Sequence, residues 1–276
     1  MKWVHQRLVF VPFLLFVALF FIIPLVDLVR SSVTGSNGWT FHHYMTVFQN
    51  AFIVQAFQQS IQLSLVSALI ALVFTLVTVY AMSSFSEAAQ ARVLLLTNVL
   101  SNVSGIPLAF AFIVLLGNSG VLLLLADAWG IPIGSFSLYS WVGLLLVYIY
   151  FQLPLALLLL YPVMESVRRE WKEAASLLGA SSFRFWHRIG IPVLWPSIVG
   201  TFSILFANAI GAYASAYALT GSNYNLVSIR IGALLSGDIF AQPELASAIA
   251  VLLGVVMIVT MLLSEWTLRK TRRRLG

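Results

Sequence analysis

The sequence predicts an all-α polytopic membrane protein with six transmembrane helices, and two observations lead to this fold class. Of its 276 residues, 61% are apolar and only 9% are charged, whereas soluble domains are about 45–50% apolar and about 25% charged. The apolar stretches are continuous rather than alternating, which excludes a transmembrane β-barrel. Since the hydrocarbon offers no water, the backbone groups of these stretches must be satisfied within helices.

Six segments are long enough to span a membrane, because a helix needs about 20 apolar residues to cross roughly 30 Å of hydrocarbon. The first apolar segment is too long for the core of a cleaved signal peptide, and no small-residue cleavage site follows it. We therefore expect it to be retained. The chain is predicted to be a single transmembrane domain, residues 1–276, whose spans are residues 8–29, 59–82, 94–116, 140–162, 197–217 and 244–266.

The third predicted span has an unusual composition. Its first turns are polar, and Gly105-Ile106-Pro107 should kink or loosen the helix. The apolar run at Val121–Ala126 is too short to cross a membrane, so we expect a short interfacial element in an external loop.

The distribution of basic residues orients the predicted spans. Of the 15 Lys and Arg residues, only Arg30 and Arg230 fall outside if the N-terminus is cytoplasmic. An excess of Lys and Arg on the inner side is the usual topology signal. We therefore expect both termini in the cytoplasm, and the basic C-terminal tail to be a membrane anchor rather than a nucleic-acid site.

The largest cytoplasmic segment, residues 164–195, interrupts the apolar sequence between the fourth and fifth spans. A predicted helix ends at Gly179, where a left-handed cap usually needs glycine. Ser181 or Ser182 is expected to cap a second short helix rich in aromatic residues, which Pro192 and Pro196 should end. Such an amphipathic surface suits either the lipid headgroups or a groove in a soluble partner, and the pattern alone leaves both open.

This loop resembles the cytoplasmic signature of permease subunits of binding-protein-dependent ABC importers of the type I fold. That signature is Glu-Ala-Ala, three residues, Gly, nine residues, then Ile-x-Leu-Pro. The only departure here is Ile191 in place of Leu. The matching residues are Glu173, Ala174, Ala175, Gly179, Ile189 and Pro192.

The resemblance implies that the loop is a coupling helix that docks into a cleft of an ATP-hydrolysing subunit. Small Ala174 and Ala175 would allow close approach, Glu173 would pair with a basic rim residue, and Gly179 would supply a tight turn or a plain helix cap. The implied partners are two ATP-binding subunits, a second permease (a sibling or a copy of this chain), an external solute-binding protein and membrane lipid. The implied location is the bacterial inner membrane.

Catalytic and metal motifs are absent from the sequence. Without a G-x-x-x-x-G-K-[ST] motif the chain has no P-loop, so ATP and Mg²⁺ are expected on the partner ATPase and no cofactor on this chain. His42 and His43 are adjacent, which is poor spacing for a metal site. We predict that the chain is not an enzyme and binds no nucleic acid.

Polar residues within spans are candidates for the translocation path, because such side chains usually face the bundle interior or a water-filled route. The alternative, interhelical hydrogen bonding that only holds the bundle together, stays open for each residue. The candidates are Asn98, Asn102, Gln152, Asn208 and Tyr213.

The expected cargo is a small solute. By resemblance the chain looks most like the polyamine (spermidine/putrescine) branch, with permeases for sulfate, thiamine, ferric iron or phosphonate as alternatives. A stand-alone secondary transporter would need an ionisable residue within a span, and a membrane enzyme would need clustered acids, bases or ligands. The sequence shows neither feature.

Overall fold

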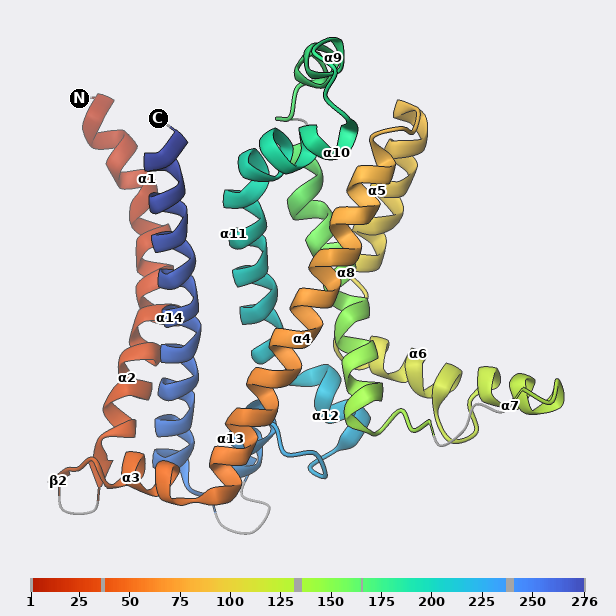
Figure 1. Cartoon of the computed structure of the whole chain (residues 1–276). Coiled ribbons are helices and arrows are strands. Elements are labelled where there is room, and N and C mark those ends of the chain that lie inside the picture. The colour runs from red at the N-terminus through yellow and green to blue at the C-terminus, as the bar shows by residue number, and fades with distance from the viewer. Residues whose placement is uncertain (1, 36–37, 132–135, 165, 237–240, 276) are drawn as a thin grey trace. The chain divides into compact units, whose positions relative to one another are not determined.

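The structure is a computed structural model that describes residues 2–35, 38–131, 136–164, 166–236 and 241–275. Helices dominate the described residues, and Figure 1 shows their order along the chain. Six of the described segments are long and apolar enough to cross a membrane: Phe10–Ser32, Ala51–Met82, Ile106–Ala128, Trp141–Met164, Ser182–Ile210 and Pro243–Arg269. The fold class expected from the sequence is therefore present.

The chain divides into two compact units, each described here by itself. The first comprises Met1–Phe57 and Asn225–Val256, and the second comprises Gln58–Tyr224 and Met257–Gly276. The elements of the first unit are α1 (Lys2–Val17), the π-helix η1 (Ala18–Ile22), α2 (Ile23–Ser32), β1 (Thr34–Gly35), β2 (Gly38–Trp39), α3 (His42–Gln49), the start of α4 (Ala51–Met82), α13 (Val227–Ser236) and the start of α14 (Pro243–Leu275).

Polar contacts fix the first unit around the beginning of α4. Asn50 caps this helix, its Oδ1 accepting the backbone N–H of Phe52 at 3.0 Å. Asn225 Nδ2 donates to the Phe52 carbonyl at 2.8 Å, and Arg230 Nε donates to Asn225 Oδ1 at 3.0 Å. The loop before α13 is thereby tied to the first turn of α4. β1 and β2 form a short antiparallel hairpin.

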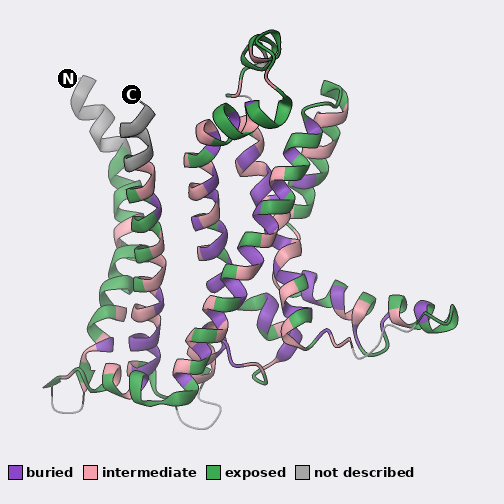
Figure 2. Ribbon diagram, in the orientation of Figure 1, coloured by how far each residue is buried: buried purple, intermediate pink, exposed green. Residues whose placement is uncertain are grey.

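The second unit is built around α8 (Trp141–Met164), which packs against α5 (Glu87–Ser101) and α11 (Ile191–Ile210). Its buried face runs along the helix from Leu144 to Leu160, and the purple segments of Figure 2 mark this core. The other elements of the unit are the rest of α4, α6 (Ile106–Leu116), α7 (Val121–Ala128), α9 (Arg169–Leu177), α10 (Ser182–Phe185), the π-helix η2 (Trp186–Gly190), α12 (Ala214–Thr220) and the end of α14.

The predicted third span, residues 94–116, is wrong as one continuous helix. It begins on α5, which ends at Ser101, and continues on α6, which starts at Ile106 and runs across the direction of α8 (Figure 1). Gly105, the residue directly before α6, has φ +69°, a backbone conformation that favours glycine, and Pro107 suits the first turn of the new helix. The expected loosening at this point is thus a complete break.

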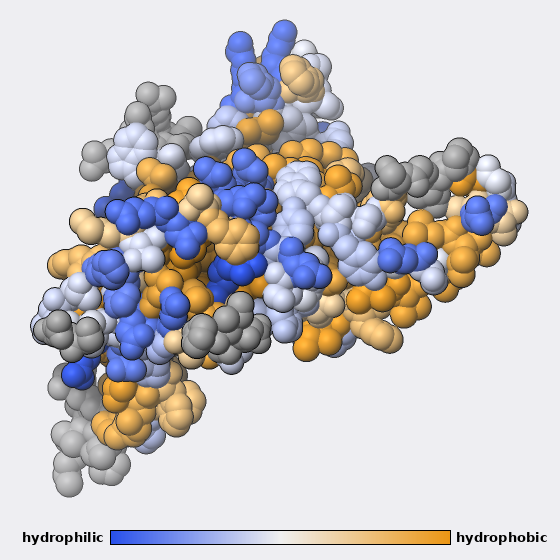
Figure 3. All heavy atoms as spheres, turned by 90° about the horizontal axis from the view of Figure 1, so that it is seen from below, coloured by the Kyte–Doolittle hydropathy of each residue, from blue (hydrophilic) through white to orange (hydrophobic). Residues whose placement is uncertain are grey.

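The apolar run after this span forms the helix α7, slightly longer than the predicted element Val121–Ala126. α6 and α7 together form the apolar segment Ile106–Ala128. In Figure 3 much of the visible surface of the arm that carries these two helices is apolar. Phe110, Leu122 and Leu125 of these helices are exposed. An apolar covering of this kind needs lipid or protein around it.

The predicted fifth span, residues 197–217, starts and ends too late. The helical course runs from Ser182 through η2 into α11 and stops at Ile210, after which α12 forms a separate helix. Pro192 and Pro196 therefore do not end the short helix as expected. Pro192 lies in the first turn of α11, where no backbone N–H is required, and the wider π-turn precedes it.

Candidate coupling loop and translocation cavity

The loop expected to contact a partner begins with α9 and a regular glycine cap. Gly179 N–H donates to the Ser176 carbonyl at 3.0 Å, and Ala180 N–H donates to the Ala175 carbonyl at 3.0 Å. This pair of bonds is the Schellman arrangement, and it requires the positive φ of Gly179, +77°. An added Cβ would meet no atom within 4 Å, so backbone conformation rather than space demands glycine here.

Of the two serines expected to cap the next helix, Ser181 is the cap. Its Oγ accepts the backbone N–H of Arg184 at 3.3 Å, and α10 then begins at Ser182. The chain therefore reverses between two capped helices, which fixes the tip of the loop by hydrogen bonds rather than by packing.

The tip carries three large apolar side chains that are almost fully exposed. Leu177, Leu178 and Phe183 are 89%, 88% and 82% exposed. Ala174 is also exposed, and Ala175 is half-buried. Figure 1 shows α9 beyond the ends of α5, α8 and α11. A compact apolar tip with small residues behind it has the shape of a helix that enters a groove.

The base of the loop, by contrast, is firmly packed. Phe185 is buried, and the Trp186 ring meets Tyr80 of α4 edge-to-face with centroids 5.4 Å apart. A Cβ on Gly190 would lie 2.3 Å from a Trp186 ring carbon, so only glycine allows the ring to sit on the helix. Sequence reasoning passed over Gly190, although a glycine four residues after a tryptophan in a helical segment is a visible signal.

The remaining signature residues lie on both sides of the tip. Glu173 lines a small cavity of about 250 Å³ beside Lys172, Ile189 lies at 36% exposure on η2, and Pro192 lies in the first turn of α11. The signature thus joins α9 to the helix that continues into the bundle. The contacts of these residues with a partner stay a prediction.

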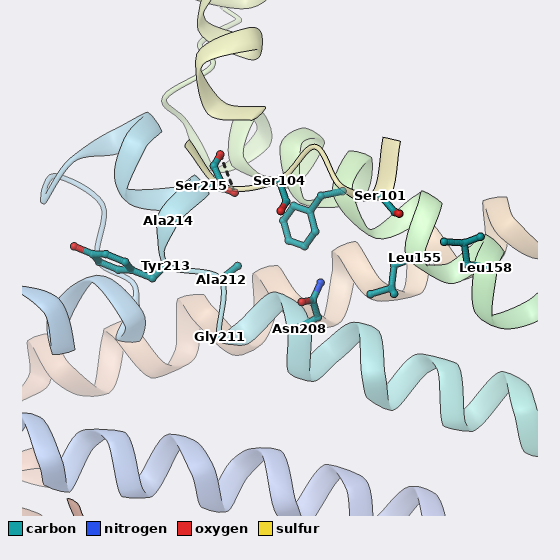
Figure 4. A pocket seen from close by; sticks show the side chains of 12 residues that line it. Ser101, Ser104, Leu155, Leu158, Asn208, Gly211, Ala212, Tyr213, Ala214 and Ser215 are labelled. Atoms are coloured by element: carbon teal, nitrogen blue, oxygen red, sulfur yellow. Dashed lines mark hydrogen bonds between the residues drawn. The ribbon is translucent and has the colours of Figure 1, made fainter. Parts of the chain in front are cut away.

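A larger cavity, about 610 Å³, lies between the two breaks in the helices. Ser101, Ser104 and Gly105 come from the end of α5 and the first break, and Asn208 and Tyr213 come from the end of α11 and the second. Figure 4 shows Asn208 and Ser104 on opposite walls. Leu155 and Leu158 of α8 add an apolar side.

Hydrogen bonds hold the two breaks together. Ser215 Oγ donates to the Gly105 carbonyl at 3.4 Å, and the buried Tyr148 donates its hydroxyl proton to the Ala212 carbonyl at 3.1 Å. Non-helical backbone at membrane depth is tolerated where it is buried or lines a water-filled space. The breaks therefore place peptide groups beside a cavity lined by polar side chains.

Two of the five path candidates line this cavity, Asn208 and Tyr213. Asn98 and Asn102 are not among its described lining residues, and Asn102 Nδ2 donates to the Asn98 carbonyl at 2.7 Å within the helix end. Gln152 is buried and donates through Nε2 to Ser67 Oγ of α4 at 2.7 Å, which is the geometry of an interhelical link. The roles of all five in transport stay predictions.

The lining also includes Ser215 and Phe151, which the sequence did not single out. A serine two residues beyond a Gly-Ala-Tyr turn carries no distinctive sequence signal. Its position depends on the second helix break, which hydropathy alone does not reveal, because residues 197–217 are mostly apolar on both sides of the break.

Comparison with known proteins relates this architecture to transport. Over 242 residues the chain is 24% identical to the probable sulfate transport system permease protein cysT of Chlorella vulgaris, covering 86% of this chain and 87% of the relative. Over 182 residues it is 27% identical to the sulfate transport system permease protein CysW of Escherichia coli (strain K12), covering 64% and 61%. These relatives give no support to the expected polyamine branch.

Among solved structures, the crystal structure of a bacterial ABC transporter involved in the import of the acidic polysaccharide alginate contains a similar chain. The TM-score is 0.77 at 19% identity, and the match covers 98% of this chain and 96% of that one. This likeness confirms the predicted permease fold. The family described as "Binding-protein-dependent transport system inner membrane component" matches residues 83–273, more than half of the sequence. The chain belongs to this family and is a multi-pass, inner-membrane permease subunit of an ABC importer.

Proposed function

We propose that the chain forms half of the translocation path of an ATP-driven importer for sulfate or a similar tetrahedral oxyanion. The observation that carries this proposal is the pair of sulfate permeases among its relatives, one of which aligns with more than four-fifths of the chain. An external binding protein would deliver the anion, and a second permease, a sibling or a copy of this chain, would complete the path.

The chemistry of the large cavity supports an anion over a polyamine. Its described lining offers neutral hydrogen-bond donors, the hydroxyls of Ser104 and Tyr213 and the amide of Asn208, and includes no carboxylate. The N-terminal end of α6 also lies at this wall, where helix dipoles favour negative charge. A multiply charged cation would instead need carboxylates to offset its desolvation.

The coupling loop supports an ATP-driven mechanism. The exposed Leu177, Leu178 and Phe183 would fill a groove of an ATPase subunit, which would bind ATP and Mg²⁺ in place of this chain. Because the helical course from Ser182 to Ile210 ends beside the cavity, movement of the docked loop would reach the cavity wall. ATP binding and hydrolysis on the partner would thereby alternate access to the path.

Uptake of labelled sulfate tests the proposal. The chain would be expressed with the transporter subunits encoded beside it in a bacterial strain that lacks its own sulfate permeases. We expect sulfate uptake that depends on ATP, that competes with other tetrahedral oxyanions and that is insensitive to putrescine. Accumulation of labelled putrescine, with no sulfate uptake by an assembled complex, would contradict the oxyanion assignment but leave the importer assignment intact.

A further inference from the structure

A second cavity, of about 540 Å³, lies behind the coupling loop and has no role in the transport path described above. Its walls come from the end of α4 and the following turn, from α5, from the end of α8 and from the base of the loop. The side chains that matter for its chemistry are Gln90, Tyr161, Arg168, Lys172, Phe185 and Trp186. It adjoins the smaller cavity that Glu173 lines, and the two share Lys172 and Phe185.

One wall of this cavity is cationic and lacks an acidic counterpart. Arg168 and Lys172, at the start of α9, both line it, and no acidic side chain does so among the residues the structure describes. Neither cation forms an ion pair within the described part of the chain. Two such charges beside one cavity would stabilise a bound anion.

A further polar group at the cavity has no partner. The indole Nε1–H of Trp186 is buried and donates no hydrogen bond. Such an orphaned donor costs free energy unless something outside the chain accepts from it. The neighbouring polar groups are already engaged, because Tyr161 donates to Gln90 Oε1 at 2.8 Å and Gln90 Nε2 donates to the Met82 carbonyl at 3.0 Å. The Trp186 nitrogen has no accessible surface, so the donors open to a ligand here are those of Arg168 and Lys172.

The size and the remaining lining of the cavity indicate which anion fits. A free oxyanion occupies the space of a few water molecules, at about 30 Å³ each, far less than the volume available. Val79, Phe85 and Met164 supply apolar wall next to the cations. A phosphate attached to a hydrocarbon chain would contact both the cations and the apolar wall. By the predicted topology the cavity opens on the cytoplasmic side, where basic pockets between helices hold lipid headgroups.

We propose that this cavity binds the phosphate of an anionic membrane lipid and so holds the coupling loop against the ends of α4 and α8. Arg168 and Lys172 contact the phosphate oxygens. A lipid in this position restrains α9, the helix that carries the apolar tip. The proposal does not depend on which solute the transporter carries.

Native mass spectrometry of the delipidated full chain, in the assembly in which it purifies, tests the proposal. Phosphatidylglycerol, phosphatidylcholine and inorganic phosphate would be added separately. We expect phosphatidylglycerol to be retained in preference to phosphatidylcholine, and R168Q/K172Q to weaken its retention roughly tenfold or more.

The matched control is R184Q/R188Q, which removes the same charge from the same loop at residues that are not among the described lining. It should retain phosphatidylglycerol to within about twofold of the unmodified chain. Gel filtration would confirm that all variants are folded. If R168Q/K172Q and R184Q/R188Q lost phosphatidylglycerol equally, general surface charge would explain the binding and the proposed site would be overturned.

Hydrogen exchange of the loop distinguishes the two sources of phosphate. Phosphatidylglycerol should slow exchange of the amides in residues 166–190 of the unmodified chain, and not in R168Q/K172Q. Protection by inorganic phosphate alone, with no preference for the lipid, would overturn the lipid assignment and give the same cavity to a soluble oxyanion. If neither phosphatidylglycerol nor inorganic phosphate slowed amide exchange, the proposed restraint of the loop would be overturned.

Discussion

The coupling loop and the translocation cavity are both built on helix interruptions with a left-handed glycine, yet they leave opposite surfaces. At the loop, Gly179 satisfies the backbone internally, and apolar side chains remain exposed. At the cavity, Gly105 immediately precedes α6 in the break between two helices, and polar side chains line the space. A positive-φ glycine between two helices thus accompanies an exposed apolar tip in one place and a polar-lined cavity in the other, and we propose that the first binds protein and the second binds solute.

The largest expected effect is on the exposed tip. L177E/L178E would place two charges in the proposed apolar groove, so binding of the ATPase subunit should fall at least about 100-fold. Co-purification of the ATPase with the tagged chain measures this. S166E adds a charge to an exposed position of the same loop and should keep the ATPase. Full retention in the double variant would show that the tip is not the docking surface.

A substitution at the base of the loop should change the stability of the protein rather than the binding of the ATPase. G190A would push a methyl group into the Trp186 ring and destabilise the protein by about 1–3 kcal/mol, because the ring is held on its other side by Tyr80. Thermal unfolding in detergent measures the change. Adding W186L should relieve the clash and restore most of the stability. If G190A left the thermal stability unchanged, the Trp186 ring would be free to move aside.

The glycine cap at the tip should have a smaller, local effect. G179A forces a side chain into the left-handed region and should cost about 1–2 kcal/mol, seen as faster hydrogen exchange in α9 by a factor of about 5 to 30. G200A is the matched control, because Gly200 lies within α11 and its added Cβ would meet nothing within 4 Å. That variant should be neutral or slightly stabilising. Equal exchange rates in G179A and the unmodified chain would remove the conformational argument for this glycine.

The smallest effect is expected at the cavity wall, where single neutral hydrogen bonds contribute little. N208L should lower sulfate uptake about fivefold without changing assembly. N98L removes the same amide from a residue outside the described lining and should leave uptake within about twofold. If N98L lowered sulfate uptake more than N208L, the path would not run through the cavity between the breaks.

The sequence predicts the regular parts of this molecule better than its interruptions. The long apolar segments and Gly179 follow from hydropathy and cap chemistry, which act over a few neighbouring residues. The second helix break, at residues 211–213, depends on hydrogen bonds from Tyr148 and Ser215 to residues distant in sequence. The continuity of the helix through Pro192 depends on a π-turn that no local pattern specifies. The cavity could therefore not be located from the sequence, although Asn208 and Tyr213 could be named.

The unbroken course from Ser182 to Ile210 has a geometric consequence. Its 29 residues extend about 40 Å at 1.5 Å per residue, with the root of the loop at one end and Asn208 near the other. A tilt of about 5° around the Trp186 contact would displace the far end by roughly 3 Å, the length of a hydrogen bond. An angular change too small to disturb the packing at the base is therefore sufficient to make or break contacts with a solute.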